Sequence, residues 1–208
     1  MLDPVPKPAP AQALQPRAER TRRALITAAE RLAAAEGEAA VTTTSAAGAA
    51  GVSVGAVYRY FPDREALLLA AYDASVDAVI EECQAALSEL PGTMPGPDAA
   101  RRLLATYLPA AAGRAGHREL LRAMRRIRPI EADHGPTSDR VVTGLLAPFL
   151  ARYGPPSGAS GERLHFLNVL MGTLVDLYLV TEAPGVRKRL RAEIEAHMLL
   201  ALQRLEVS

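Results

Sequence analysis

The sequence predicts an all-α protein with an N-terminal three-helix domain, which contains a helix-turn-helix, and a larger C-terminal helical domain. Alanine and leucine dominate the 208 residues, and β-branched residues are sparse outside a few short runs. Such a composition favours helix over strand. Apolar residues also recur at the three- and four-residue spacing that places them on one face of a helix. We therefore expect helices along most of the chain.

The N-terminal part predicts an arm and a first helix. Prolines recur through residues 1–16, which hold too little apolar surface to order themselves, so this segment is expected to be a disordered arm. Apolar residues then follow a helical spacing from about residue 17 to residue 36. Gly37 stands where the C-terminal cap of that helix belongs.

A helix-turn-helix is predicted directly after the first helix. The run 41–44 has local β-propensity, but threonines before an alanine-rich stretch also serve as helix N-caps, and we prefer that interpretation. Gly51 suits the turn after a short helix at about 43–50, because glycine adopts positive φ at little cost. Ser53 then caps a further helix, and Asp63 caps a long helix that leads into the C-terminal part.

The remainder of the chain predicts further helices. The segment 90–98 is rich in proline and glycine and ends the long helix. Beyond it, helices are expected at about 98–112, 117–128, 137–153, 161–182 and 185–205. The expected domains are the arm at 1–16, the helix-turn-helix domain at 17–64 and the C-terminal domain at 65–208.

The distribution of charge says more than the net charge of +1. Residues 41–62 contain no acid, and Arg59 is their only base. Residues 17–23 carry four arginines against Glu19. The N-terminal third therefore has a surface compatible with phosphates, although a basic run such as 17–23 is as often only a solvated face.

Several protein classes are disfavoured. Cys83 is the single cysteine, so no internal disulfide can form and a reduced, cytoplasmic setting is expected. Residues 1–16 resemble neither a signal peptide nor a transit peptide. We also expect no stretch long and apolar enough to span a membrane, and hence no membrane partner.

Enzyme signatures are missing from the sequence. The four histidines form no HExxH pair, and no nucleophile elbow or phosphate-binding glycine loop occurs. The cluster of Glu131, Asp133 and His134 adjoins a Gly-Pro turn and is interpreted as a loop. We expect no catalytic residue, no metal and no cofactor.

One motif is specific. Residues 51–67 read GVSVGAVYRYFPDREAL, with the aromatic residues Tyr58, Tyr60 and Phe61 before a capped helix whose first turn is basic. In order and spacing, residues 20–72 resemble the DNA-binding region of the tetracycline-repressor (TetR) family. The resemblance implies a homodimer that binds double-stranded operator DNA through this region and senses a small molecule with the C-terminal domain.

Side-chain chemistry and the resemblance together suggest the DNA contacts. Arg59 is the only long donor on the expected recognition helix, and its planar guanidinium can bond guanine O6 and N7 together, so it is the expected base reader. Small side chains allow close approach to base edges, and hydroxyls and Arg64 can bind phosphates. Phe61 should instead be core. The expected DNA-binding residues are Thr42, Thr43, Thr44, Ser53, Val54, Gly55, Ala56, Tyr58, Arg59, Tyr60 and Arg64.

The chain departs from the family pattern at three positions in or next to the expected DNA contacts. Thr44 stands where the family often has arginine, Ser45 where it often has an acid, and Val54 where a basic residue is frequent. We therefore formulate the hypothesis that the arginines of residues 17–23 compensate by reaching phosphates or the minor groove.

The last two predicted helices, at about 161–182 and 185–205, are expected to form the dimer interface. The first is apolar on nearly all faces and must be covered on both sides. The family resemblance implies the same four-helix contact between two copies. A two-fold dimer would hold the recognition helices ~34 Å apart and would match a pseudo-palindromic operator.

Polar residues in the C-terminal half leave alternatives open. His165, Asn168 and Asp176 share one flank of their helix and either bind a ligand or, as we prefer, pair structurally at the dimer interface. The arginines at 118, 122, 125 and 126 form a face that is solvated or, if turned inward, binds an anion such as a carboxylate or a coenzyme A thioester. Candidate ligand-binding residues are Tyr107, Met124, Asn168, Met171 and Asp176, with core packing as the alternative for the tyrosine and the methionines.

The function that these observations favour is a ligand-responsive transcriptional regulator, by family default a repressor, released from its operator by a small, largely apolar effector. The alternative is a helical DNA-binding or adaptor protein with no small-molecule effector. A closed cavity of a few hundred Å3 in the C-terminal domain would favour the sensor, and a tight core would favour the alternative.

Overall fold

The computed structural model describes residues 16–128, 136–154 and 161–206, and every regular element in these ranges is helical. The expected arm at 1–16 lies outside them except for Pro16, which begins the first helix. The loop expected around Glu131, Asp133 and His134 also lies outside the described residues. The all-α class is confirmed.

The elements follow the order expected from the sequence. The N-terminal helices are α1 (Pro16–Glu36), η1 (Glu38–Ala40), α2 (Thr43–Ala50) and α3 (Val54–Tyr58), and the long helix is α4 (Arg64–Glu89). The C-terminal helices are α5 (Gly96–Gly113), α6 (His117–Ile127), α7 (Pro136–Val141), η3 (Val142–Leu146), α8 (Ala147–Tyr153), α9 (Gly161–Val180) and α10 (Pro184–Glu206).

The helix ends confirm the expected caps. Gly37 and Gly51 have φ of 83° and 68°, a left-handed region that suits glycine. The Asp63 carboxylate accepts a hydrogen bond from the Ala66 amide at 2.7 Å and so begins α4. These local signals position α2 and α3, the two helices of the helix-turn-helix, which we call the reader helices. They do so before any tertiary contact is considered.

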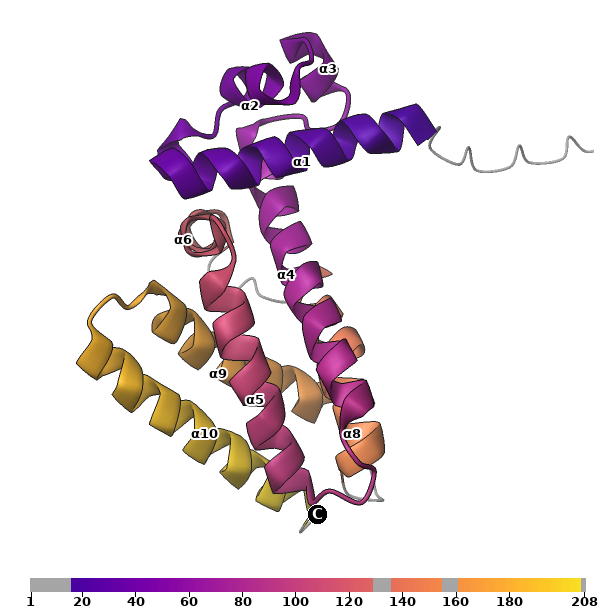
Figure 1. Ribbon diagram of the computed structural model, residues 1–208, viewed down its shortest axis with the longest axis vertical. Coiled ribbons are helices and arrows are strands. Elements are labelled where there is room, and N and C mark those ends of the chain that lie inside the picture. Colours follow the sequence, from indigo (N-terminus) through magenta and orange to yellow (C-terminus); the bar gives the residue numbers. More distant parts are fainter. Residues whose placement is uncertain (1–15, 129–135, 155–160, 207–208) are drawn as a thin grey trace, which may run out of the picture.

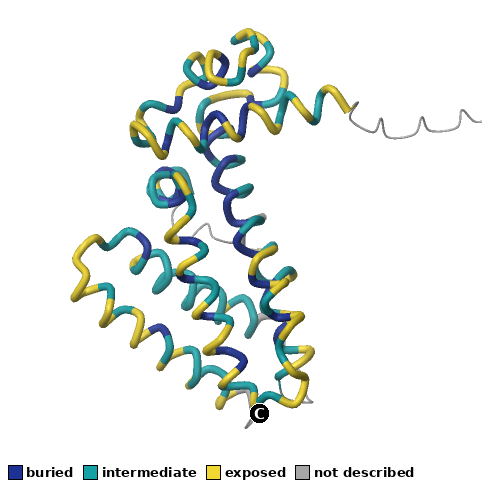
Figure 2. Tube along the Cα trace, in the orientation of Figure 1, coloured by how far each residue is buried: buried dark blue, intermediate teal, exposed yellow. Residues whose placement is uncertain are grey.

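Helix α4 connects the two ends of the molecule. It starts beneath α1–α3 and runs to the far end, where α5 turns back alongside it (Figure 1). Its buried face is continuous from Leu67 to Leu87 (Figure 2). Helices α9 and α10 form a pair on the other side of α5 (Figure 1).

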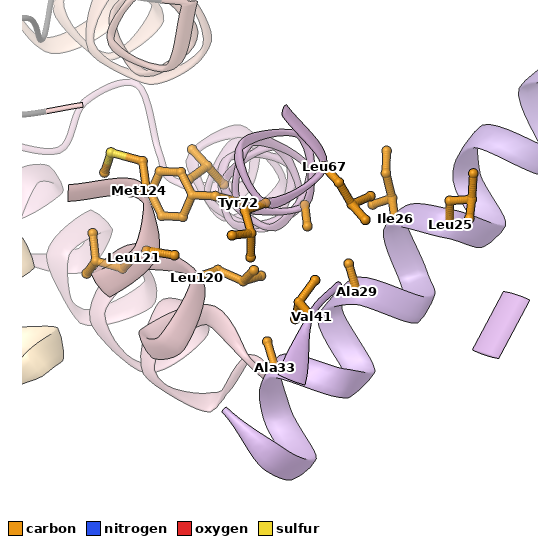
Figure 3. Close-up of a cluster of buried hydrophobic side chains, with 14 of the residues drawn as sticks. Leu25, Ile26, Ala29, Ala33, Val41, Leu67, Tyr72, Leu120, Leu121 and Met124 are labelled. Carbon is orange, nitrogen blue, oxygen red and sulfur yellow. The ribbon is translucent and has the colours of Figure 1, made fainter. Parts of the chain in front are cut away.

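The main core crosses the boundary between the expected domains. Figure 3 shows side chains of α1, such as Leu25 and Ala29, in one cluster with Leu67 of α4 and Leu120 of α6. Leu25, Ala29, Leu67 and Leu120 are all completely buried. Full burial of a leucine stabilises the fold by about 1.5–3 kcal/mol, so this cluster ties the N-terminal helices to α6. Cys83 belongs to the same cluster, as a buried structural thiol.

The helix expected at 137–153 contains a wider turn. Residues Val142–Leu146 form a π-helical segment between α7 and α8. The Gln84 side-chain amide donates to the Gly144 carbonyl at 2.7 Å, and a side chain at Gly144 would approach Ile80 Cγ2 to 2.9 Å. Close packing against α4 therefore accompanies this local widening, which hydrophobic periodicity alone does not signal.

Helix α9 corrects one expectation. By length and composition the stretch Arg163–Val180 is apolar enough to cross a membrane, whereas no such stretch was expected. Within the part of α9 whose side chains are described, Leu179 alone is buried, while Phe166 and Leu177 are 64% and 49% exposed. The helix packs on α10, α6 and α5 and carries Asp176 paired with Arg125, which are features of a helix that contacts protein.

Candidate nucleic-acid interface and ligand cavity

Reciprocal capping fixes the start of α2. The Ser45 amide donates to Thr42 Oγ1 at 3.0 Å, and the Thr42 amide donates to Ser45 Oγ at 2.9 Å. The Ser45 hydroxyl also donates to the Ala40 carbonyl at 2.6 Å. Ser45, which departs from the family pattern, thus completes a capping box that holds α2 in place.

The turn and cap before α3 orient the second reader helix. Gly51 makes the turn, and Ser53 Oγ accepts from the Ala56 amide at 3.2 Å. Val57 is fully buried and Phe61 is 3% exposed, so these two side chains anchor α3 on the core. The assignment of Phe61 to the core is confirmed.

The opposite face of α3 is open. Gly55, Tyr58 and Arg59 are exposed, and Tyr58 is 55% exposed despite its size. The Tyr58 hydroxyl lies 3.4 Å from Thr43 Oγ1 of α2. Hydroxyls from both reader helices therefore meet beside the arginine at the end of α3, and Thr42 and Thr44 are exposed on the neighbouring turn of α2.

Arg64 has internal partners. Its Nε donates to the Val41 carbonyl at 2.6 Å, and a terminal nitrogen donates to the Glu38 carbonyl at 2.7 Å. These bonds join the start of α4 to the segment that precedes α2. In this structure the guanidinium positions the reader helices, and the phosphate contact expected of Arg64 stays a prediction.

A basic groove runs between α1 and the end of α2. Arg20, Arg23 and Arg31 line it, and Arg31 donates to the Ala49 carbonyl at 3.2 Å. Arg22 instead stacks on the Phe61 ring, with its guanidinium carbon 5.6 Å from the ring centre. Sequence reasoning missed Arg31, although it follows Arg20 and Arg23 at helical spacing along α1.

The C-terminal domain contains a partly open cavity of about 190 Å3. Its wall is mostly apolar and is built from α4, α5, α6, α7, η3, α8, α9 and α10. All five candidate ligand-binding residues line this cavity: Tyr107, Met124, Asn168, Met171 and Asp176. Of the four arginines expected to be solvated or turned inward, Arg125 lines the cavity, as do the apolar residues Leu145 and Phe149. These two apolar residues were not expected there, because no sequence pattern identifies which apolar side chains face a cavity and which fill the core.

Charged groups in the cavity wall form an ion pair. Arg125 Nε donates to Asp176 Oδ2 at 2.5 Å, and both side chains are mostly buried. Burial, with Asp176 nearby, raises the pKa of Tyr107 well above its usual range, so this phenol stays protonated. Asp176 therefore pairs with Arg125 of the same chain and faces the cavity, and the expected pairing of Asp176 across a dimer interface stays a prediction.

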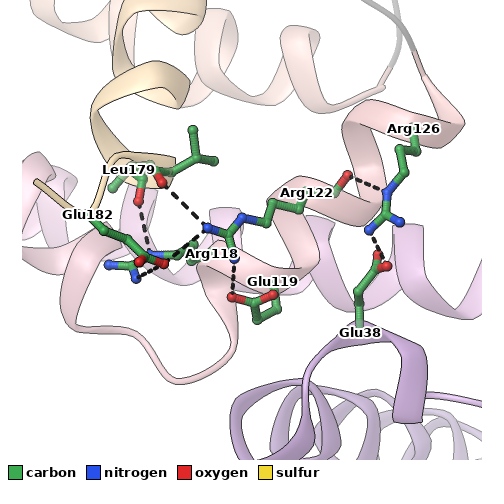
Figure 4. A network of polar contacts seen from close by, with 8 residues as sticks. Glu38, Arg118, Glu119, Arg122, Arg126, Leu179 and Glu182 are labelled. Carbon is green, nitrogen blue, oxygen red and sulfur yellow. Dashed lines mark hydrogen bonds and ion pairs between the residues drawn. The ribbon is translucent and has the colours of Figure 1, made fainter.

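The other arginines of α6 are paired with acids outside the cavity (Figure 4). Arg118 and Arg122 both contact Glu182, and Arg122 also contacts Glu119 at 2.8 Å. Arg126 pairs with Glu38 next to α1. These three arginines are therefore part of a solvated face that also carries ion pairs, and the paired acids leave little positive charge for an anionic ligand.

Helix α6 also contacts the reader domain directly. Gly116, just before α6, has φ of 75°, and a side chain there would lie 2.6 Å from the Glu30 carbonyl of α1. His117 Nδ1 lies 2.8 Å from Ser75 Oγ of α4, and both residues are buried. The helix that carries Met124 and Arg125 into the cavity wall is therefore packed closely against α1.

Metal binding receives no support from the ranges 16–128, 136–154 and 161–206. There, no group of three or more His, Cys, Asp and Glu side chains is placed to hold a metal ion.

Comparisons with known proteins agree with this geometry. Residues 25–71 match the family model described as bacterial regulatory proteins, tetR family. No curated protein sequence matches the chain. A TetR-family transcriptional regulator from Streptomyces coelicolor is similar, with 20% identity over 89% of this chain and 99% of that chain and a TM-score of 0.61.

Two further solved structures are similar. The TetR family repressor AlkX from a Dietzia strain has 20% identity over 89% of this chain and 96% of its own, with a TM-score of 0.62. FadR from Thermus thermophilus, a TetR family repressor in complex with lauroyl-CoA, has 22% identity over 89% and 93%, with a TM-score of 0.57. These likenesses show the fold: a helix-turn-helix domain followed by a helical C-terminal domain.

Proposed function

We propose that this chain, whose residues 25–71 match the family model of bacterial regulatory proteins, tetR family, binds a pseudo-palindromic operator as a homodimer and leaves it when a small effector binds. Repression is the proposed mode, and the cytoplasm is the proposed location. The single observation that carries the DNA-binding part is the exposed face of α3. There Arg59 and Tyr58 stand beside the small residue Gly55 on a rigidly capped helix.

The face of α3 has the chemistry that reading a major groove requires. A recognition helix needs small side chains for close approach and a long planar donor for base edges, and Gly55 and Arg59 provide these. The hydroxyls of Tyr58 and Thr43 meet at 3.4 Å and can hold one phosphate between α2 and α3. We propose that Arg59 reads bases and that these hydroxyls contact the backbone.

Homodimer formation is supported by the incomplete cover of α9 and α10. Large apolar side chains remain exposed on both helices: Phe166, Leu177, Val186 and Leu200. Large apolar side chains left exposed on two helices that pack together are typical of a protein interface. We propose that a second copy covers it by two-fold symmetry, which would place two α3 helices on successive major grooves.

Effector binding is supported by the cavity, which the adaptor alternative does not require. We propose that residues 17–64 form the DNA-binding domain and that residues 65–208 form the effector-binding and dimerisation domain. Helix α6 would couple them, because Met124 and Arg125 line the cavity while Arg126 pairs with Glu38 next to α1. A coupling of about 1–3 kcal/mol would weaken operator binding by roughly 5- to 150-fold.

The test is binding to DNA fragments that flank the protein's own gene, measured by fluorescence anisotropy at several salt concentrations. Wild type should prefer a palindromic fragment over a scrambled one of equal length. Arg59→Ala should reduce that preference by about 1–3 kcal/mol, because it removes a base contact. Tyr58→Phe should weaken binding to both fragments alike, because it removes a backbone contact.

Tyr153→Phe is the matched control. The Tyr153 hydroxyl donates to the Pro91 carbonyl at 3.1 Å. This contact lies just beyond the C-terminal end of α4, far from the reader helices, so DNA binding should not change. Binding that is weak, salt-sensitive and blind to sequence for folded wild-type protein would contradict the operator-binding proposal.

A further inference from the structure

Three polar side chains from three helices line the mostly apolar wall of the cavity, to which Asn168 and Tyr72 also contribute. Tyr107 comes from α5, Arg125 from α6 and Asp176 from α9. The Asp176 carboxylate accepts from Arg125 Nε at 2.5 Å, and Tyr107 lines the same cavity. We call this group the polar triad. It is the only part of the described wall that contains charged side chains.

The charge of the polar triad is balanced. Arg125 is the only cation among the described lining residues, and its charge is neutralised by Asp176. An anionic ligand would have to face the Asp176 carboxylate or break a mostly buried ion pair, which costs several kcal/mol when one partner is left alone. A carboxylate or a coenzyme A thioester is therefore disfavoured as a ligand, and an uncharged ligand is favoured.

The Tyr107 hydroxyl is available within the described structure. No hydrogen-bond partner for it is found among residues 16–128, 136–154 and 161–206, although its ring lines the cavity. A hydroxyl in an apolar wall gains from a partner, since it has lost its hydrogen bonds to water. A ligand group beside it can supply that bond.

The group that suits both Tyr107 and Asp176 is a hydroxyl. The carboxylate of Asp176 only accepts, so its ligand partner must donate, whereas the phenol of Tyr107 can donate to the same ligand oxygen. A carbonyl oxygen only accepts and leaves the carboxylate without a ligand partner. A hydrocarbon satisfies neither. The volume of about 190 Å3 suits a ring-sized skeleton, since a dry cavity of ~150 Å3 holds benzene.

We propose that the effector is an uncharged, largely apolar alcohol or phenol, bound with its hydroxyl between Tyr107 and Asp176. This inference rests on the proposed role of the cavity as the effector site. It excludes carboxylates and coenzyme A thioesters as preferred ligands of this chain.

Isothermal titration calorimetry without DNA tests the proposal, so its result does not depend on whether an operator is found. The probes share one skeleton and differ in one group: 4-ethylphenol, 4-ethyltoluene and 4-ethylbenzoate. A second set, 1-octanol, octane and octanoate, repeats the comparison on a chain. The hydroxyl probe of at least one set should bind roughly tenfold more tightly than its hydrocarbon and its carboxylate.

Two variants test the assigned contacts. Tyr107→Phe should reduce the affinity for the hydroxyl probe toward that of the hydrocarbon and leave the hydrocarbon affinity unchanged. Asp176→Asn should remove the negative charge that faces the ligand beside Arg125 and make the carboxylate probe the preferred ligand, which simple loss of structure cannot do. Tyr178→Phe is the control, because Tyr178 stacks on Arg187 at 4.6 Å and does not line the cavity.

The outcomes separate clearly. A hydroxyl preference that Tyr107→Phe removes and Tyr178→Phe retains supports the proposal. Carboxylate preference in wild type, equal affinity for hydroxyl and hydrocarbon, or no binding of either set overturns it. Operator binding measured separately on the same preparation shows whether the proposed regulatory function fails as well.

Discussion

His117 lies at the point where three helices meet. It is 2% exposed, its Nδ1 is 2.8 Å from Ser75 Oγ of α4, and its ring centre is 5.6 Å from that of Tyr72. Burial, together with the nearby charge of Arg114, lowers the pKa of His117 to about 4. The residue is therefore neutral in the folded protein at neutral pH, and protonating it opposes folding.

A pH dependence of stability follows from this shift. The unfolded chain takes up a proton at His117 below about pH 6.5, whereas the folded chain does so only near pH 4. The contribution of His117 is therefore full above pH 6.5 and declines as the pH falls to 4, by about 3 kcal/mol in total. Urea unfolding at pH 7.5 and pH 4.5 should show a smaller loss of stability for His117→Gln than for wild type.

A control separates this effect from other titrating groups. Glu30 of α1 has a raised pKa through burial, so it acts in the opposite direction and is present in every variant. His197→Gln, at a half-exposed histidine of α10, should retain the wild-type pH slope. If the unfolding free energy of wild type, His117→Gln and His197→Gln changed equally with pH, the assignment to His117 would be contradicted.

At the scale of the element, α6 is the helix on which sensing and DNA binding depend together. Its start packs against the backbone of α1 through Gly116, and its far half faces the cavity through Met124 and Arg125. Leu120 and Leu121, between these points, are fully buried. A shift of α6 caused by a ligand would therefore reach α1 without an intermediate element.

The contact at Gly116 can be tested by one methyl group. Gly116→Ala would place a Cβ 2.6 Å from the Glu30 carbonyl at a φ of 75°, so we expect a loss of about 2–4 kcal/mol in unfolding free energy. Gly113→Ala has nothing within 4 Å and should lie within about 1 kcal/mol of wild type. Equal stabilities of the two variants, measured by urea unfolding, would show that α6 does not press on α1.

At the scale of the whole molecule, apolar side chains of α9 and α10 remain uncovered. Helix α9 is the most apolar long helix, yet Phe166 and Leu177 remain exposed, and Val186 and Leu200 of α10 are exposed as well. Most buried side chains lie instead between α1, α4 and α6. A second copy of the chain would complete the cover of α9 and α10.

Phe166→Glu should prevent that association. A carboxylate at the centre of an apolar interface loses its hydration without a partner, so we expect the mass measured by light scattering to fall from that of a dimer toward that of a monomer. Ala35→Glu, at an exposed position of α1, should remain dimeric. A monomeric mass for wild type at micromolar concentration would contradict the homodimer, and an unchanged mass for the variant would exclude Phe166 from the interface.

Local signals in the sequence determined the helical class, the order of the elements and the caps at Gly37, Gly51, Ser53 and Asp63, because each depends on residues only a few positions apart. Tertiary structure decided the rest. The enclosure of Arg125 with Asp176, the internal bonds of Arg64 and the contact of Gly116 with α1 join residues 23 to 86 positions apart. Such contacts depend on how the helices pack, and helical periodicity records only which face is apolar and not which helix covers it.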